Sequence, residues 1–256
     1  MDVSEASRQQ WENSLRHPWE TVRARIITFL LTNYSQRRIA HILEMGSGDA
    51  YILRQLALQN AASHFSAIDT AYTDQLLSQL TIQAPEISFY SSAAQFEQML
   101  NPADVALLPD VLEHVQQDHS LWSAITKNTI TSATALIIVT APAFQMLFSD
   151  HDRNLKHFRR YTRKQLVGLC SSANVKVLAS GHFFFTLLVA RVVFIAIQKV
   201  TRKSSKRSID NWQGGKLTSS IISAILWIDF RIGFLASKFG LSIPGLSCYC
   251  VCQKLP

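Results

Sequence analysis

Two glycines separated by one residue form the turn with the clearest chemical meaning in this sequence. Gly46 and Gly48 follow the apolar run 39–45, and a helical pattern begins at residue 49. Glycine lets a backbone pass close to a ligand, and the first turn of a helix presents free N–H groups. The pattern predicts a strand–loop–helix unit that binds a nucleotide-like ligand. A tight turn without a ligand is the alternative.

The neighbours of the two glycines narrow the choice of ligand. A dinucleotide-binding turn needs a third glycine at position 51, which is Tyr51 here. A phosphate-binding loop needs Gly-Lys-Ser/Thr, which this turn lacks. Glu44, two residues before Gly46, would repel phosphates but suits a cationic ligand. These residues disfavour a nicotinamide dehydrogenase and leave a sulfonium nucleoside as the best candidate.

Three segments resemble one family. Glu44-Met-Gly46-Ser-Gly48-Asp-Ala50 resembles motif I (acid-x-Gly-x-Gly-x-Gly) of the class I S-adenosylmethionine-dependent methyltransferases, with Ala50 replacing the third glycine. Asp69 matches the acid that hydrogen-bonds the ribose hydroxyls in that family. The run 110–115, Asp-Val-Leu-Glu-His-Val, is similar to the ubiquinone-biosynthesis-type members, and 141–162 resembles a bacterial subgroup of them. The resemblance covers residues 20–182 and implies the cofactor S-adenosyl-L-methionine.

The resemblance also implies how the cofactor is bound. Asp69 would hold the ribose, segment 91–93 would flank the adenine, and segment 109–111 would line the methionine side. The expected cofactor-binding residues are Glu44, Gly46, Ser47, Gly48, Asp69, Ser91, Ser92, Asp110 and Val111.

A hydroxyl or acidic-carbon acceptor needs a base for methyl transfer. The candidates are His151, Asp110 and His114. His151 lies between Asp150 and Asp152, which would orient its ring and stabilise its protonated form. A solvated loop histidine is the alternative. In quinone O-methyltransferases the matching positions can hold a divalent cation, so Asp110, Glu113 and His114 form an alternative metal site, but we assign no metal.

Segment 157–164, His-Phe-Arg-Arg-Tyr-Thr-Arg-Lys, is densely basic. It predicts either a clamp on an anionic group of a substrate or membrane, or an ordered lid. In the lid, Thr162 would cap the helix that follows and Tyr161 would pack inward.

The elements that must position these residues alternate between strand and helix. Apolar runs near 39–45, 64–69, 87–90, 104–108, 135–140, 175–179 and 247–253 predict seven strands separated by helical patterns. The fold class is therefore α/β, with a doubly wound, mostly parallel sheet of the Rossmann-like methyltransferase type.

We expect N-terminal cap helices at 1–36, a cofactor-binding core at 37–182, a helical apolar insert at 183–239, and the final core strand within 240–256. The second cap helix would bury Val22, Ile26, Ile27, Leu30 and Leu31.

Composition limits the class of protein. The chain has 256 residues, of which 48% are hydrophobic and 17% charged, so it can bury a core and is not disordered. We see no signal peptide at its start and expect a cytoplasmic protein.

Three of its four cysteines fall in 248–252, where one strand face would carry all three. Small buried residues are the expected role, and a soft-metal site is the alternative.

The sequence of the insert predicts that this part of the chain contacts a membrane. Its two apolar runs, 183–197 and 217–239, are joined by a basic connector that contains Lys199, Arg202, Lys203, Lys206 and Arg207. The first run is too short to span a bilayer, and both contain charged residues, so the insert would lie on the inner face of a membrane. A buried helical pair covering the sheet or a dimer face is the alternative.

The expected function is methyl transfer from S-adenosylmethionine to a small or lipid-linked acceptor. The alternative is an inactive, cofactor-binding partner protein held at a membrane. Nucleic acid is not an expected partner, because the N-type DNA enzymes carry Asn/Asp-Pro-Pro-aromatic where this chain has Leu108-Pro109-Asp110-Val111. The oligomeric state is left open.

Overall fold

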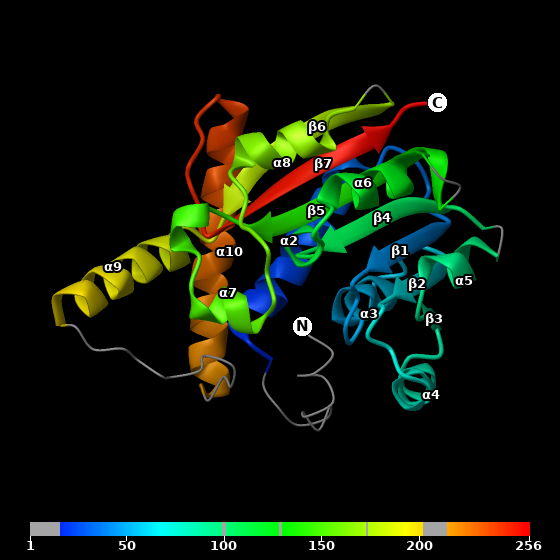
Figure 1. Cartoon of the computed structure of the whole chain (residues 1–256), viewed down its shortest axis with the longest axis horizontal. Coiled ribbons are helices and arrows are strands. Elements are labelled where there is room, and N and C mark those ends of the chain that lie inside the picture. Colours follow the sequence, from blue (N-terminus) through cyan, green and yellow to red (C-terminus); the bar gives the residue numbers. More distant parts are fainter. Residues whose placement is uncertain (1–15, 99–100, 128–129, 173, 202–213) are drawn as a thin grey trace.

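The computed structural model describes residues 16–98, 101–127, 130–172, 174–201 and 214–256. At its centre is one seven-stranded sheet of order β3-β2-β1-β4-β5-β7-β6 (Figure 1). β7 runs antiparallel to both of its neighbours, and the other pairs are parallel. The strands are β1 (His41–Met45), β2 (His64–Ile68), β3 (Ile87–Tyr90), β4 (Ala103–Pro109), β5 (Thr131–Pro142), β6 (Val175–Phe183) and β7 (Ser247–Lys254). The expected fold class is confirmed.

Side chains that alternate along the strands form a core on each face of the sheet. Leu107 and Ile138 pack on one face with α2 (Pro18–Tyr34), α3 (Tyr51–Leu58) and α10 (Lys216–Lys238). Leu108 and Val139 pack on the other face, which α5, α6 and α8 cover. The five residues expected to be buried on the second cap helix are all buried in α2. The remaining helices are α4 (Asp74–Gln83), α5 (Ala93–Glu97), α6 (Asp118–Lys127), α7 (Asp150–Asn154), α8 (Arg163–Cys170) and α9 (Phe185–Thr201).

Several boundaries differ from those expected. The polar segment around residue 151 is a short helix, α7, rather than a loop, because Ser149 and Asp152 form a capping box at its start. β6 continues to Phe183, so the insert begins one residue later, and α9 starts at Phe185. Most of the first expected cap helix lies outside the described residues, as does most of the basic connector.

Cys248, Cys250 and Cys252 lie on one face of β7, as expected, and belong to the same core. The fourth cysteine joins them from a helix. Cys170 of α8 meets Cys250 and Cys252, and the three sulfur atoms lie within 4.8 Å of one another. Cys248 instead donates to the carbonyl oxygen of Ala141. All four are buried thiols, as expected for small core residues.

The order of the strands reverses between β1 and β4. β2 and β3 lie on one side of β1, and β4 and β5 continue on the other. In open α/β sheets, ligands bind at such a point, beyond the carboxyl ends of the strands. The glycine turn follows β1, Asp69 follows β2, and Asp110 follows β4, so the fold brings all three to this point.

Candidate functional site

The glycine turn adopts the left-handed conformation that its sequence predicts. Gly46 and Gly48 have φ of +63° and +52°, and Ala50 has φ of 53°. Gly46 donates from its N–H to the carbonyl oxygen of Ile68 at 2.8 Å. A β-carbon on Gly46 would lie 2.7 Å from Cγ2 of Val111, so this turn passes close to the segment after β4. Gly46 is therefore required both by its conformation and by the contact with Val111.

Asp69 ties the end of β2 to the glycine turn. Its Oδ2 accepts from the N–H of Gly48 at 2.9 Å, and its Oδ1 accepts from the N–H of Ala71 at 2.9 Å. A carboxylate oxygen can accept more than one hydrogen bond, so each oxygen keeps capacity for a ligand hydroxyl. The hydroxyl of Tyr72 donates to the carbonyl oxygen of Gly48 at 2.8 Å and fixes the same turn. Sequence reasoning did not identify Tyr72.

Glu44 is a buried carboxyl group beside this turn. It is 2% exposed, and its Oε2 has no hydrogen-bond partner within the described chain. Burial, with a smaller contribution from the nearby Asp49, raises the pKa of Glu44 to about 8. An unsatisfied buried carboxyl costs free energy unless a ligand reaches it. A cationic or hydrogen-bond-donating ligand group would satisfy Glu44, as the sequence suggests.

Asp110 is held by two residues at the end of β4. Its Oδ2 forms an ion pair with Arg23 of α2 at 2.8 Å, and its Oδ1 accepts from the hydroxyl of Thr140 at 2.8 Å. Its φ is +53°, a conformation that aspartate tolerates better than most residues. These bonds leave Asp110 positioned at the reversal point but already neutralised by an arginine.

Arg16, the first described residue, contacts the glycine turn and the start of α3. Arg16 forms an ion pair with the buried Asp49, and its guanidinium lies 3.9 Å from the centre of the Tyr51 ring. Tyr51, the residue that excludes a dinucleotide turn, therefore has a packing role. No pattern around Arg16 indicated this contact.

Ser91 and Ser92 lie after β3, where the adenine-flanking segment was expected. Both are half-buried. The Ser92 hydroxyl accepts from the N–H of Gln95 and caps α5, and the Ser91 hydroxyl donates to the side-chain oxygen of Gln95. Both serines have local structural bonds besides any role toward a ligand.

His151 lies on α7, but its two flanking carboxylates are bound by other residues. Asp150 pairs with Arg153. Asp152 is fully buried and accepts from His157 at 3.1 Å and from Arg160 at 2.8 Å. Burial alone would raise the pKa of Asp152, but these bonds hold the pKa well below its usual range. Both flanking carboxylates therefore also bind residues other than His151.

Through its bond to His157, Asp152 adjoins a group around Glu113 that could hold a divalent cation. Ligand atoms of Glu113, His114 and His157 lie within 4.8 Å of one another. Glu113 is fully buried, and neither carboxylate oxygen has a hydrogen-bond partner among the described residues. Burial, and then the charge of Asp110, raises the pKa of Glu113 well above its ordinary value. The possible metal site therefore consists of Glu113, His114 and His157. Asp110, which was expected in it, is bound by Arg23.

The basic segment 157–164 forms a lid rather than an open clamp. Tyr161 donates to Asp118 at 2.7 Å, and Arg159 forms an ion pair with the same carboxylate at 2.7 Å. Thr162 caps α8 by accepting from the N–H of Gln165 at 3.2 Å, as expected. Arg159 and Arg160 are both paired with carboxylates of the chain.

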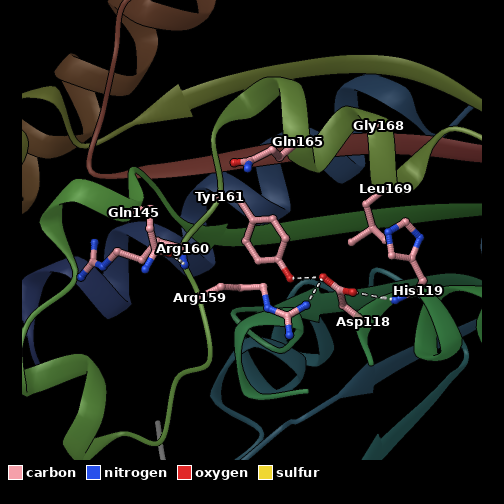
Figure 2. Close-up of a pocket in the computed structure, with 9 residues that line it drawn as sticks. All are labelled: Asp118, His119, Gln145, Arg159, Arg160, Tyr161, Gln165, Gly168 and Leu169. Atoms are coloured by element: carbon pink, nitrogen blue, oxygen red, sulfur yellow. Dashed lines mark hydrogen bonds and ion pairs between the residues drawn. The ribbon is translucent and has the colours of Figure 1, made fainter. Parts of the chain in front are cut away.

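This lid borders a cavity of about 390 Å³ (Figure 2). Asp118, Arg159, Gln145 and Gln165 are among the residues that line it. None of the glycine-turn residues lines it. We place the chemistry at the reversal point of the sheet instead, because the unsatisfied carboxyl groups and left-handed turns gather there.

His182 was not identified from the sequence. It stacks on Phe144 with ring centroids 5.5 Å apart, and neither ring nitrogen has a hydrogen-bond partner in the described chain. Burial, and then the charge of Arg163, lowers its pKa to about 4, so the ring is neutral at pH 7. A single histidine in an apolar, aromatic run has no sequence pattern around it that predicts a functional role.

Comparison with solved structures identifies the fold. The plantazolicin methyltransferase BpumL, solved in complex with S-adenosylhomocysteine, is 12% identical, with a TM-score of 0.57 over 99% of this chain and 89% of BpumL. The methyltransferase domain of bacterial CtHen1-C is 13% identical, with a TM-score of 0.55 over 93% of this chain and 99% of that domain. The [4+2]-cyclase SpnF is 12% identical, with a TM-score of 0.55 over 96% of this chain and 85% of SpnF.

The chain has the fold of the class I S-adenosylmethionine-dependent methyltransferases. No family model and no curated protein matches the sequence. One of the similar structures is a cyclase, so the fold alone does not define the reaction.

Proposed function

We propose that this protein is an S-adenosylmethionine-dependent methyltransferase that acts on a small or lipid-linked acceptor. One observation carries the proposal: the left-handed glycine turn after β1 is bonded through Gly48 to Asp69, at the point where the strand order reverses. The sheet brings the glycine turn and Asp69 together, and carboxylates beside a glycine turn suit a cationic nucleoside. The ubiquinone-type subgroup is part of the proposal, supported by the run from Asp110 to His114.

The residues at the carboxyl ends of β1, β2 and β4 would hold the cofactor. Asp69 would accept hydrogen bonds from the ribose hydroxyls, as a charge-assisted pair. Gly46 and Gly48 let the backbone approach closely, and the unsatisfied Oε2 of Glu44 fits the positively charged part of the ligand. The full proposed set is Glu44, Gly46, Ser47, Gly48, Asp69, Ser91, Ser92, Asp110 and Val111. S-adenosylmethionine supplies a methyl group on a sulfonium, which the acceptor displaces.

The protein's own contribution is alignment, exclusion of water and removal of a proton from the acceptor. We propose His151, Asp110 and His114 as the catalytic residues. His151 is the preferred base, because Arg23 already neutralises Asp110. His114 is placed beside His157, with ring centroids 4.5 Å apart. We assign no metal to the proposed reaction.

The expected location is the cytoplasm, with peripheral contact to the inner face of a membrane through residues 183–239. The partners are a small-molecule or lipid-linked acceptor and the membrane surface, without nucleic acid.

Calorimetry with S-adenosylhomocysteine tests the proposal. The wild-type protein should bind, and Asp69→Ala should abolish binding. Asp69→Ala also removes two backbone contacts, so thermal unfolding must show that the variant is folded. Asp74→Ala is the matched control, because Asp74 is an exposed aspartate at the start of α4 and should leave binding unchanged.

Acceptor turnover then separates an active enzyme from a protein that only binds the cofactor. The protein is incubated with cell extract and cofactor carrying a labelled methyl group, and mass spectrometry identifies the labelled products. Folded wild-type protein that binds neither S-adenosylmethionine nor S-adenosylhomocysteine would contradict the proposal.

A further inference from the structure

α9 is an apolar helix with almost no protein around it. Figure 1 shows it projecting away from the sheet. Large apolar side chains are exposed on most of its circumference, which an apolar helix inside a folded protein would not show. They are Phe185, Val189, Val192, Val193, Phe194 and Ile197, between 41% and 54% exposed.

α10 has two opposite apolar faces, and only one of them is covered. Leu226, Phe230 and Phe234 are buried on the inner face, where Phe230 and Phe234 meet Phe29 of α2 edge to face. A spacing of three and four residues places the other apolar side chains on the outer face. They are Leu217, Ile221, Ile225, Ile228, Ile232 and Leu235, between 46% and 76% exposed.

The middle of α10 is held against the folded domain by several contacts. Arg231 lies 4.9 Å from the centre of the Phe29 ring, and Arg25 of α2 lies 3.9 Å from that of Trp227. Asp229 accepts from the N–H and hydroxyl of Thr186 at 2.9 and 3.1 Å, which joins the middle of α10 to the start of α9. Among the described helices, only Lys216–Lys238 is long and apolar enough to cross a membrane. Crossing would require breaking these contacts, so the helix is suited to lie along a surface.

The charge around the two helices indicates what covers them. Residues 199–238 contain eight basic and two acidic side chains. A two-fold dimer would bring the same patch of each copy together, and the net positive charge that the sequence gives this region would oppose it. An anionic lipid surface pairs with them instead, at about 1 kcal/mol per basic residue near the membrane.

We propose that the exposed faces of α9 and α10 lie in the headgroup region of an anionic bilayer, without spanning it. The apolar side chains enter one leaflet, and the net positive charge of residues 199–238 attracts the anionic lipids. Resting on the proposed function, the same surface identifies the acceptor as lipid-linked. His182, three residues before α9, stacks on Phe144, which follows β5, with ring centroids 5.5 Å apart, so the start of the membrane-facing helix adjoins the segment after β5.

Vesicle flotation tests the surface on the full chain. Wild-type protein should float with phosphatidylcholine vesicles that contain phosphatidylglycerol, and binding should weaken as salt is added. Ile225→Asp/Ile232→Asp should weaken binding by at least about tenfold, because it places two charges on the inserted face. Leu58→Asp/Ile82→Asp is the matched control, since both side chains are highly exposed (78% and 80%) but lie on α3 and α4. It should float like wild type.

Parallel measurements separate the alternatives. Wild-type protein that never floats, or floats equally on vesicles of phosphatidylcholine alone, would overturn the proposal. Sedimentation that shows a dimer disrupted by Ile225→Asp/Ile232→Asp, without vesicle binding, would identify a second copy as the occupant. Resistance to alkaline carbonate extraction from cell membranes would identify a spanning helix. Binding of S-adenosylhomocysteine is measured on every variant, so a failure of cofactor binding with intact flotation would reject the proposed function alone.

Discussion

Arg23 of α2 forms an ion pair with Asp110, the residue directly after β4, at 2.8 Å. Both side chains are about one-fifth exposed (19% and 20%). The pair joins the N-terminal helix to the point where the strand order reverses, between segments far apart in the sequence. It therefore orders one wall of the proposed active site before any ligand is bound.

A double-mutant cycle on Arg23→Leu and Asp110→Asn should give a coupling free energy of about 1–3 kcal/mol in urea unfolding. The pair is partly shielded from water, so its attraction is screened less than at the surface. The matched control is Arg153 with Asp150, whose side chains are 65% and 90% exposed. That cycle, with Arg153→Leu and Asp150→Asn, should give about 0–1 kcal/mol. Equal coupling in the two cycles would show that Arg23 does not order this wall.

Gly46→Ala should destabilise the protein and weaken binding of S-adenosylhomocysteine. The new β-carbon would lie 2.7 Å from Cγ2 of Val111, and φ of +63° adds about 1–2 kcal/mol for a residue with a side chain. Adding Val111→Ala should recover part of the stability by removing the clash, while the backbone cost remains. Gly168→Ala is the control in thermal unfolding. It lies in helix α8 with no atom within 4 Å of a new β-carbon, and it should stabilise by about 0.5–1 kcal/mol. Full recovery in the double variant would show that the left-handed turn imposes no backbone cost.

The sequence predicted the fold and the cofactor turn well, because both depend on local patterns. Strand–helix alternation marked each strand, and Gly46, Gly48 and Asp69 each follow a predicted strand end. The sheet then brings such ends together without further information. Glu44 could be singled out because its charge is unusual at that position.

The acceptor side could not be predicted in the same way. The bonds of Asp152 to His157 and Arg160 depend on how a short helix packs, and Asp150 and Asp152 look equivalent in the sequence. The meeting of Cys170 with Cys250 and Cys252 joins residues 80 or more positions apart. Contacts of this kind depend on tertiary packing, and the spacing of apolar residues in the sequence does not predict them.

His151→Ala should lower methyl transfer at least about tenfold and leave the affinity for S-adenosylhomocysteine nearly unchanged. A general base contributes about 10²–10⁴-fold, and the histidine lies on α7, after β5, on the proposed acceptor side. Turnover is measured from pH 6 to 9 on the acceptor identified from extract. His64→Ala is the control, because His64 is exposed and lies at the amino end of β2, whereas the proposed site lies at the carboxyl ends of the strands. Equal turnover of His151→Ala and wild type across this range would remove His151 from the mechanism.

The buried carboxyl of Glu44 should make stability fall as pH rises, and Glu44→Gln should remove that contribution. Burial and the nearby Asp49 raise the folded-state pKa of Glu44 to about 8 from its ordinary value of 4.5. Between these values the folded protein binds more protons than the unfolded chain, so each unit of pH lowers the free energy of unfolding by up to about 1.4 kcal/mol. The stabilisation is complete below the unfolded pKa and is lost as pH rises through about 8.

Urea unfolding of wild type and Glu44→Gln at pH 5, 6, 7 and 8 measures this difference. The wild-type free energy should fall relative to the variant over the whole interval, and the curves should run parallel at higher pH. Glu86→Gln, at an exposed glutamate before β3, should reproduce the wild-type profile. Saturating S-adenosylmethionine should reduce the difference, because a cationic ligand beside Glu44 favours its ionised form. Parallel wild-type and Glu44→Gln curves from pH 5 to 8 would show that Glu44 is not buried as a proton-binding group.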